Sequence, residues 1–257
     1  QDCCDEECVY YPSLSAPGTL SQLFKMKLTS TLLLTCLSIS LISCTGNQPG
    51  NFPEKPNIVF IMSDDHAYQA ISAYNSDLVS TPNIDLIADR GIIFNKAFVT
   101  NSICAPSRAV ILSGKFSHLN GVPGNGQVFD GSQQTFPKIL QQNGYQTAMI
   151  GKWHLKSHPT GFDYWNVLPG QGDYYNPDFI EQGKDTIYEG YVTDIITELS
   201  LGWLKNRDKG EPFCLMMHHK APHRSWMPAI KHLELFNDKD FPLPGNFYDD
   251  YEGKEAL

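Results

Sequence analysis

The fold is decided by Asn57-Ile58-Val59-Phe60-Ile61-Met62, which is followed at once by Ser63-Asp64-Asp65-His66. An apolar run of this length is typical of a strand that is buried on both faces of a parallel sheet. Two further runs, residues 145–150 and 212–217, are likewise followed by charged or histidine-rich segments. We therefore predict three buried strands, each of which is followed directly by a charged or histidine-rich segment.

Helical signals separate these three runs. Residues 81–91 begin with Thr-Pro and end in glycine, and residues 135–144 follow the same pattern with Thr-Phe-Pro and glycine. Between residues 191 and 204, apolar side chains recur at helical spacing. Strands that alternate with helices indicate an α/β fold, with a largely parallel sheet that has helices on both faces.

The charged segments after the three strands are far apart in the chain. Open parallel sheets bind ligands outside the carboxyl ends of their strands. The sequence therefore predicts that the segments beginning at residues 63, 151 and 218 converge on one cleft.

Composition excludes several classes of protein. The 257 residues are 41% hydrophobic and only 18% charged, which indicates a globular core. With 19 Lys and Arg against 28 Asp and Glu, the formal charge of −9 has the wrong sign for neutralising phosphates, so we expect no nucleic-acid partner. Seven cysteines, an odd number, are too few for a disulfide scaffold in a chain of this size.

The amino-terminal segment is interpreted as a targeting signal that is not part of the folded domain. We interpret residues 1–25 as a leader of doubtful origin, with a small metal-binding knuckle at its cysteines as the alternative. Residues 26–43 have the basic start and short apolar run of a signal peptide, too short to span a bilayer. They end in Leu-Ile-Ser before Cys44, which resembles a bacterial lipobox, although an ordinary signal peptide would also fit.

A lipobox would make Cys44 the lipidated first residue of the mature protein. The expected location is then the bacterial periplasm or cell surface, with the lipid anchor as the only membrane contact. Residues 44–56 contain glycine and proline and are expected to form a flexible tether. The folded domain is expected to occupy residues 57–257.

Asp64 and Asp65 stand side by side where the first strand ends. Two adjacent carboxylates repel each other unless a cation lies between them, and oxygen ligands favour calcium or magnesium over zinc. The alternative is a solvated acidic turn or helix cap.

Cys104 begins the segment Cys104-Ala105-Pro106-Ser107-Arg108. Proline suits the first turn of a helix, so the cysteine is expected at a helix N-terminus, where backbone N–H groups favour an anion. Arg108, one turn later, adds a planar fork for a tetrahedral oxyanion. The pattern indicates a nucleophile beside an anion site, with a buried structural cysteine as the alternative.

This segment, with Leu112-Ser113-Gly114-Lys115 after it, resembles the signature of the type I sulfatases. Three further motifs of that family match in order: Asp64-Asp65, Gly151-Lys152-Trp153-His154 and Lys220-Ala221-Pro222-His223. The resemblance covers about residues 55–257 and is most similar to bacterial N-acetylglucosamine-6-sulfatases and mucin-desulfating enzymes. It implies an alkaline-phosphatase-like fold of which this chain is the amino-terminal part.

The resemblance also implies a metal and a modified residue. A maturation enzyme would convert Cys104 to formylglycine, and one calcium ion would be held by Asp64, Asp65 and residue 104. The hydrate of the aldehyde would attack sulfur, and collapse of the hydrate would then release sulfate. Sulfatases usually supply a second acidic pair and another lysine from further downstream, so the 257 residues alone are expected to bind calcium weakly and to turn over little.

Other roles carried over from the family concern charge and proton transfer. Arg108 and Lys152 would stabilise charge on the sulfate oxygens, and Lys220 would contact the sulfate or pair with an acid. His223 would protonate the leaving sugar oxygen and His154 would support or deprotonate the hydrate, or the two would exchange these roles. The remaining histidines of interest are expected in the core or behind the site: His66, His118, His218 and His219.

The resemblance implies a sulfuric ester hydrolase. Its expected substrate is a sulfated glycan, with the 6-O-sulfate of N-acetylglucosamine in mucin or glycosaminoglycan as the specific expectation. One alternative is a metal-dependent phosphatase or phosphodiesterase of the same fold, although such enzymes usually carry Ser or Thr as nucleophile and a zinc pair. The other is a surface lipoprotein that binds sulfated glycans without cleaving them.

Overall fold

The structure is a computed structural model that describes residues 55–75 and 77–255. The predicted leader (1–25), the signal peptide (26–43), Cys44 and all but the last two residues of the tether lie outside the described residues. None of the described helices has both the length and the apolar character that crossing a membrane requires.

A six-stranded sheet organises the described chain, with the strand order β1-β6-β2-β3-β4-β5. Its strands are β1 (Ile58–Met62), β2 (Gln146–Lys152), β3 (Tyr164–Leu168), β4 (Asp178–Glu181), β5 (Lys184–Ile187) and β6 (Phe213–His218). The first four strands in this order are parallel, whereas β4 and β5 form an antiparallel hairpin at the far edge. The three predicted strands are confirmed as the neighbours β1, β6 and β2.

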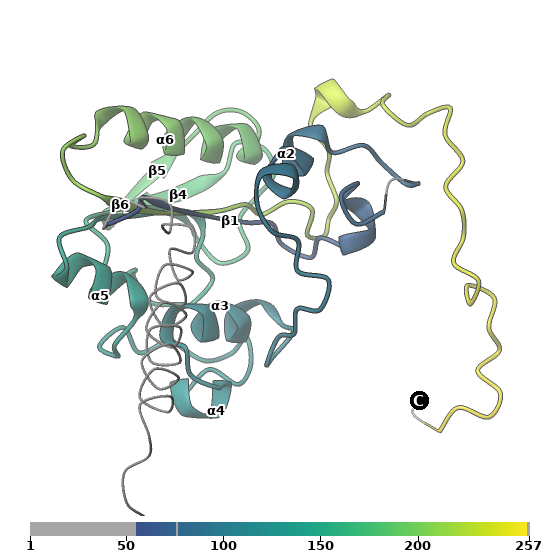
Figure 1. Ribbon diagram of the computed structural model, residues 1–257, viewed down its shortest axis with the longest axis horizontal. Helices are drawn as coiled ribbons and strands as arrows, with labels where there is room; N and C mark the ends of the chain where they lie inside the picture. Colours follow the sequence, from purple (N-terminus) through teal and green to yellow (C-terminus); the bar gives the residue numbers. More distant parts are fainter. Residues whose placement is uncertain (1–54, 76, 256–257) are drawn as a thin grey trace, which may run out of the picture. The chain divides into compact units, whose positions relative to one another are not determined.

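Helices cover both faces of this sheet, as predicted. In Figure 1, α6 (Val192–Asn206) lies on one face, and α5 (Phe136–Gln142) and α3 (Cys104–Ser113) lie on the other. The other helical elements are η1 (Tyr68–Ala70), α2 (Pro82–Arg90), α4 (Ser117–Asn120) and η2 (Ile230–His232). The sequence signals predicted α2, α5 and α6 to within a few residues, and the α/β fold class is confirmed.

Alternate residues of the central strands supply two separate apolar cores. Met149 and Met216 point to the α3 and α5 face, where they join Leu112 of α3. Ile150 and Leu215 point to the other face, where they join Ile196 and other residues of α6. Because successive strand residues point to opposite faces, β2 and β6 must be apolar on both sides, and their runs read as continuous.

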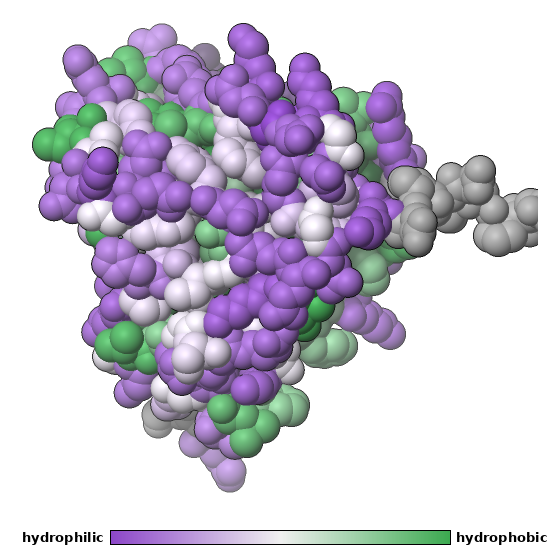
Figure 2. All heavy atoms as spheres, turned by 90° about the vertical axis from the view of Figure 1, so that its left-hand side faces the viewer, coloured by the Kyte–Doolittle hydropathy of each residue, from purple (hydrophilic) through white to green (hydrophobic). Residues whose placement is uncertain are grey.

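The expectation that β1 is buried on both faces is wrong. Ile58 and Phe60 pack on the α3 and α5 side, but Val59 and Ile61 on the other face are 49% and 54% exposed. The reason is position, because β1 is the end strand of the sheet and α6 packs on β6 and β2. Figure 2 shows the side of the molecule that lies at the left in Figure 1. This side is largely hydrophilic, with hydrophobic side chains in scattered groups.

This difference in burial predicts a difference in stability. Leu215→Ala is expected to lower the free energy of unfolding by about 2 to 5 kcal/mol, because the side chain is buried in β6 and leaves a cavity. Val59→Ala, at the paired position on β1, is expected to cost less than about 1 kcal/mol, because that side chain is half in water. Urea unfolding followed by circular dichroism measures both, and equal losses would contradict the packing described above.

Candidate active site

Main-chain contacts bring three distant segments together at the carboxyl ends of the central strands. The amide of Asp64 donates to the carbonyl of Ala221 at 3.0 Å. Gly151 packs so closely on β6 that a Cβ there would lie 2.0 Å from the carbonyl oxygen of His218, and its φ is +101°. Only glycine fits such an approach, and it places Lys152 beside the end of β6.

Asp64 is a buried carboxylate between two buried cations. Lys152 Nζ forms an ion pair with its Oδ2 atom, and Arg108 Nη2 lies 3.6 Å from the same oxygen. The pair of Asp64 with Lys152 and the main-chain bond from Asp64 to Ala221 join the segments after β1, β2 and β6, which confirms their predicted convergence. Two cations against one carboxylate leave this part of the site positive.

Arg108 is held from behind by β2 and β6. Its Nη1 atom donates to the carbonyl of Lys152 at 2.5 Å and lies 3.1 Å from Nδ1 of His218. Burial holds the pKa of His218 well below its usual value, so this imidazole is neutral. Nε of Arg108 is buried and has no partner among the described residues.

Cys104 is the first residue of α3, as the proline in its segment predicts. Its Sγ atom lies 3.9 Å from Nε2 of His223. The Nδ1 atom of His223 lies 2.8 Å from the carbonyl oxygen of Arg224, which can only accept, so Nδ1 carries the hydrogen and Nε2 faces the thiol. Cys104 is half-buried at this site, whereas Cys214 in β6 is buried in an apolar core.

His154 lies near the same cations in a left-handed backbone conformation, with φ +54°. Burial, and after it the charges of Lys152 and Arg108, lowers its pKa to about 4. Its buried Nδ1 atom has no partner among the described residues. At neutral pH this imidazole is uncharged.

Gln171 connects the two lysines of the site, and the sequence analysis missed it. Its side-chain Oε1 accepts from Lys152 Nζ at 2.5 Å, and its carbonyl oxygen accepts from Lys220 Nζ at 3.2 Å. Lys220 is therefore held by a main-chain carbonyl and takes part in none of the ion pairs formed by the described residues. The available signal was the position of Gln171 just after β3, but that strand was not predicted.

The candidate metal ligands differ in part from the predicted set. Ligand atoms of Asp64, Cys104 and His223 lie within 4.8 Å of one another. The side chain of Asp65 is 60% exposed, and its Oδ2 atom lies 3.5 Å from Nε2 of His223. Calcium takes six to eight oxygen ligands, so the carboxylates of Asp64 and Asp65 fit part of its shell. Weak calcium binding by this chain remains our expectation, which a calorimetric titration tests.

The other histidines that were expected in the core or behind the site are His66, His118 and His219. His66 lines the same cavity as Asp64 and Cys104, and His219 follows β6 directly, in a largely buried position. The expectation for His118 is wrong, because it is exposed in the four-residue helix α4 and stacks on Phe116. Because α4 is short and lies at the surface, the side chain of His118 is not buried.

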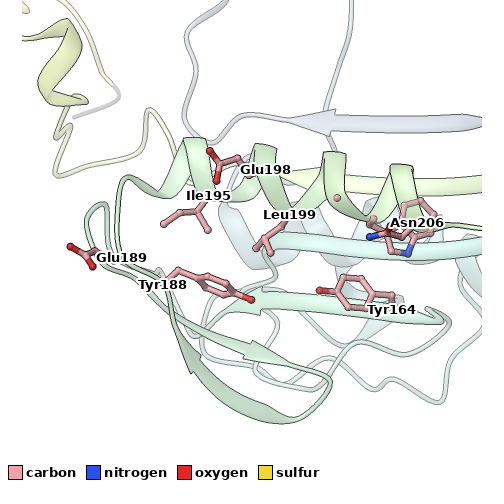
Figure 3. A pocket seen from close by; sticks show the side chains of 9 residues that line it. Tyr164, Tyr188, Glu189, Ile195, Glu198, Leu199 and Asn206 are labelled. Carbon is pink, nitrogen blue, oxygen red and sulfur yellow. The ribbon is translucent and has the colours of Figure 1, made fainter.

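Three cavities adjoin the cluster. One of about 470 Å³ is lined by residues that include Asp65 and Cys104, one of about 300 Å³ by residues that include His154 and Gln171, and one of about 270 Å³ by residues that include Lys220 and His223. A separate cavity of about 490 Å³ lies under α6, where Tyr164 and Tyr188 point toward Leu199 (Figure 3). That separate cavity contains none of the predicted site residues.

Comparison with known proteins identifies the family. The model of the sulfatase family matches residues 56–256, and the chain belongs to that family. It is 56% identical to an N-acetylglucosamine-6-O-sulfatase of Bacteroides thetaiotaomicron over 88% of this chain and 41% of the relative. It is 32% identical to the N-acetylglucosamine-6-sulfatase of Homo sapiens over 75% of this chain and 39% of that protein.

Solved structures agree with this assignment. A protein in complex with its substrate D-glucosamine-2-N,6-O-disulfate superposes with a TM-score of 0.76 at 58% identity, over 78% of this chain and 41% of that one. Another, in complex with k-i-k-neocarrahexaose, gives a TM-score of 0.68 at 26% identity, over 73% of this chain and 50% of that one. The chain thus spans about two fifths of the length of the curated relatives named above.

The lowered pKa of His154 predicts how stability depends on pH. Between its unfolded value of 6.5 and the folded value of about 4, the unfolded chain takes up a proton that the folded chain rejects. Its contribution to stability is therefore present above pH 6.5 and is lost as the pH falls toward 4. His154→Gln is expected to lose less stability than the parent between pH 7.5 and 4.5 in calcium-free urea unfolding.

The matched control is His118→Gln, which makes the same change at an exposed histidine. It is expected to follow the parent curve. Identical pH slopes for the parent and His154→Gln would contradict a lowered pKa at residue 154.

Proposed function

We propose that the protein hydrolyses a sulfate ester on a carbohydrate, and that the substrate group is the 6-O-sulfate of a glucosamine residue in mucin or glycosaminoglycan. The observation that carries this proposal is Cys104 at the start of α3, with His223 against its thiol and Arg108 in the following turn. The named relatives act on 6-O-sulfated N-acetylglucosamine or bind a 6-O-sulfated glucosamine.

The positive side of the cluster suits a sulfate group. Arg108 lines the same cavity as Cys104, and Lys152 is fixed by Asp64 and Gln171. Donors that are fixed before the substrate arrives need no reorganisation as charge grows on the sulfate oxygens. Lys220 adds a third positive group at the neighbouring cavity, where it would contact the sulfate.

Asp64, Asp65 and residue 104 would hold the calcium ion that is general to the family, and residue 104 would carry its formylglycine. When present, these groups supply positive charge beside the sulfate and a hydrated aldehyde oxygen for attack on sulfur. His154, which lies near Lys152 and Arg108 and is uncharged at neutral pH, is assigned as the group that supports or deprotonates the hydrate. His223 is assigned as the proton donor to the leaving sugar oxygen.

Two rival functions make different predictions at residue 104. A phosphatase or phosphodiesterase would use an unmodified nucleophile, for which Ser or Thr is usual, whereas this chain has cysteine. A lipoprotein that only binds sulfated glycans would keep Cys104 as a thiol. The state of this one side chain therefore separates the proposed function from both rivals.

The test is peptide mass spectrometry of the full-length protein after expression with a formylglycine-generating enzyme. An aldehyde is expected at Cys104, and Cys214 serves as the internal control that stays a thiol, because it is buried and burial raises its pKa to about 11. The same protein is expected to release sulfate from 6-O-sulfated N-acetylglucosamine, and Cys104→Ala to release none.

Three outcomes would count against the proposal. An unmodified thiol together with tight glycan binding would favour the binding lipoprotein. Faster cleavage of the matched 6-phosphate ester would favour the phosphatase. Activity that survives in Cys104→Ala would remove residue 104 from the chemistry.

We also propose that Cys44 is lipidated and anchors the protein at the bacterial periplasmic or cell surface. Labelling of cells with a clickable palmitate analogue is expected to mark the parent and to fail in Cys44→Ala. Cys36→Ala, a change inside the predicted signal peptide, is the control that keeps the label. Equal labelling of the parent and Cys44→Ala would refute the anchor.

A further inference from the structure

Three tyrosine hydroxyls hold the segment that follows β6. Tyr174 donates to the carbonyl of His223, Tyr191 donates to that of Met227 at 2.9 Å, and Tyr175 donates to that of Pro228 at 2.6 Å. The three rings also pack together, with ring centroids 6.0 Å apart for Tyr174 and Tyr191 and 5.2 Å apart for Tyr175 and Tyr191. Three side chains that lie outside the segment therefore hold three of its main-chain carbonyls.

Tyr174 differs from the other two tyrosines because it touches the proposed active site twice. Its hydroxyl reaches the main chain of His223, and its ring lies 4.9 Å from Nζ of Lys220. A cation over an aromatic face is attracted by the ring, the more so away from water, and Tyr174 is only 4% exposed. One side chain therefore contacts the two residues that we assign to proton donation and sulfate contact.

The other bonds of the His223 main chain and of its Nδ1 atom stay within the segment. Its amide donates to the carbonyl of Lys220 at 3.1 Å, and its Nδ1 lies 2.8 Å from the carbonyl oxygen of Arg224. These local bonds fix the ring relative to the turn. Two bonds from outside join the turn to the body of the domain: the Asp64 amide bonds the carbonyl of Ala221 before His223, and the Tyr174 hydroxyl bonds the carbonyl of His223 itself.

The tyrosine hydroxyl remains a donor over the whole useful pH range. Burial, and after it the neighbouring hydroxyl of Tyr191 and the negative charge of Asp64, raises the pKa of Tyr174 to about 12. The bond to the His223 carbonyl is consequently present at any pH at which a sulfatase assay is run.

We infer that Tyr174 is a positioning residue for the reaction, in which its hydroxyl sets His223 against residue 104 and its ring sets Lys220 at the sulfate. The inference rests on the proposed function. It assigns two separable effects to one side chain, because the hydroxyl and the ring can be removed independently.

The experiment uses steady-state kinetics of the full-length, matured protein on 6-O-sulfated N-acetylglucosamine. Tyr174→Phe removes only the hydroxyl and is expected to lower kcat by about 3- to 10-fold with KM nearly unchanged, the loss that one hydrogen bond supports. Tyr174→Leu also removes the ring and is expected to raise KM in addition, because Lys220 loses its support. This split between kcat and KM would not follow from a loss of stability alone.

The matched control is Tyr175→Phe, which removes an equivalent bond to the same segment at Pro228, five residues beyond His223. Its kcat and KM are expected to stay within about twofold of the parent. Equal loss of kcat in Tyr175→Phe and Tyr174→Phe, or an unchanged kcat in Tyr174→Phe, would overturn the inference.

Hydrogen exchange provides a readout that does not depend on turnover. Amides of residues 221 and 223–225 are expected to exchange faster in Tyr174→Phe than in the parent and in Tyr175→Phe. If the parent hydrolyses no sulfate ester, the proposed function fails, and unchanged exchange in Tyr174→Phe would still refute the positioning contact on its own. Should Tyr174→Leu not fold, Tyr174→Phe decides the question.

Discussion

The ion pairs of Asp64 with Lys152 and Arg108 are the interaction on which the rest of the site depends. All three side chains are buried, and a buried charge without a partner costs far more than a partnered one. Each comes from a different element, so the sheet and α3 must meet correctly for any of the charges to be tolerated. The same contact leaves an excess of positive charge next to Cys104, and a tetrahedral anion is the ligand that such an excess favours.

Packing at the ends of the parallel strands determines how accurately this charge is placed. Gly151 allows β2 to approach β6 more closely than any side chain would permit. Arg108 is then fixed by His218, at the end of β6, and by the carbonyl of Lys152. The segment after β3 contributes Gln171, and the tyrosines near the β4 and β5 hairpin hold the turn that carries His223. The antiparallel edge of the sheet therefore supports a site built on its parallel part.

Much of this arrangement could be predicted from the sequence, because the central strands are apolar and each ends in charge. The motif around Cys104 also predicted its place at a helix start and the family. The exposed face of β1 could not be predicted, because a run of apolar residues shows what can be buried and not what is available to cover it. Gln171 was missed as a site residue for a related reason, since a hydrogen bond through a main-chain carbonyl leaves no trace in a motif. The bond from Tyr174 to the carbonyl of His223 could not be predicted for the same reason. His118 lies near the motif in sequence but on the surface of the fold.

The pairing of β1 with β6 also has a consequence for biosynthesis. These strands are neighbours in the sheet although β1 ends at Met62 and β6 begins at Phe213. At translation rates of 5 to 20 residues per second, β1 would leave the ribosome on the order of 10 s before its partner. Closing so long a loop is slow, and until it closes an apolar strand has no neighbour. The nascent chain would therefore be most in need of a chaperone before β6 is made.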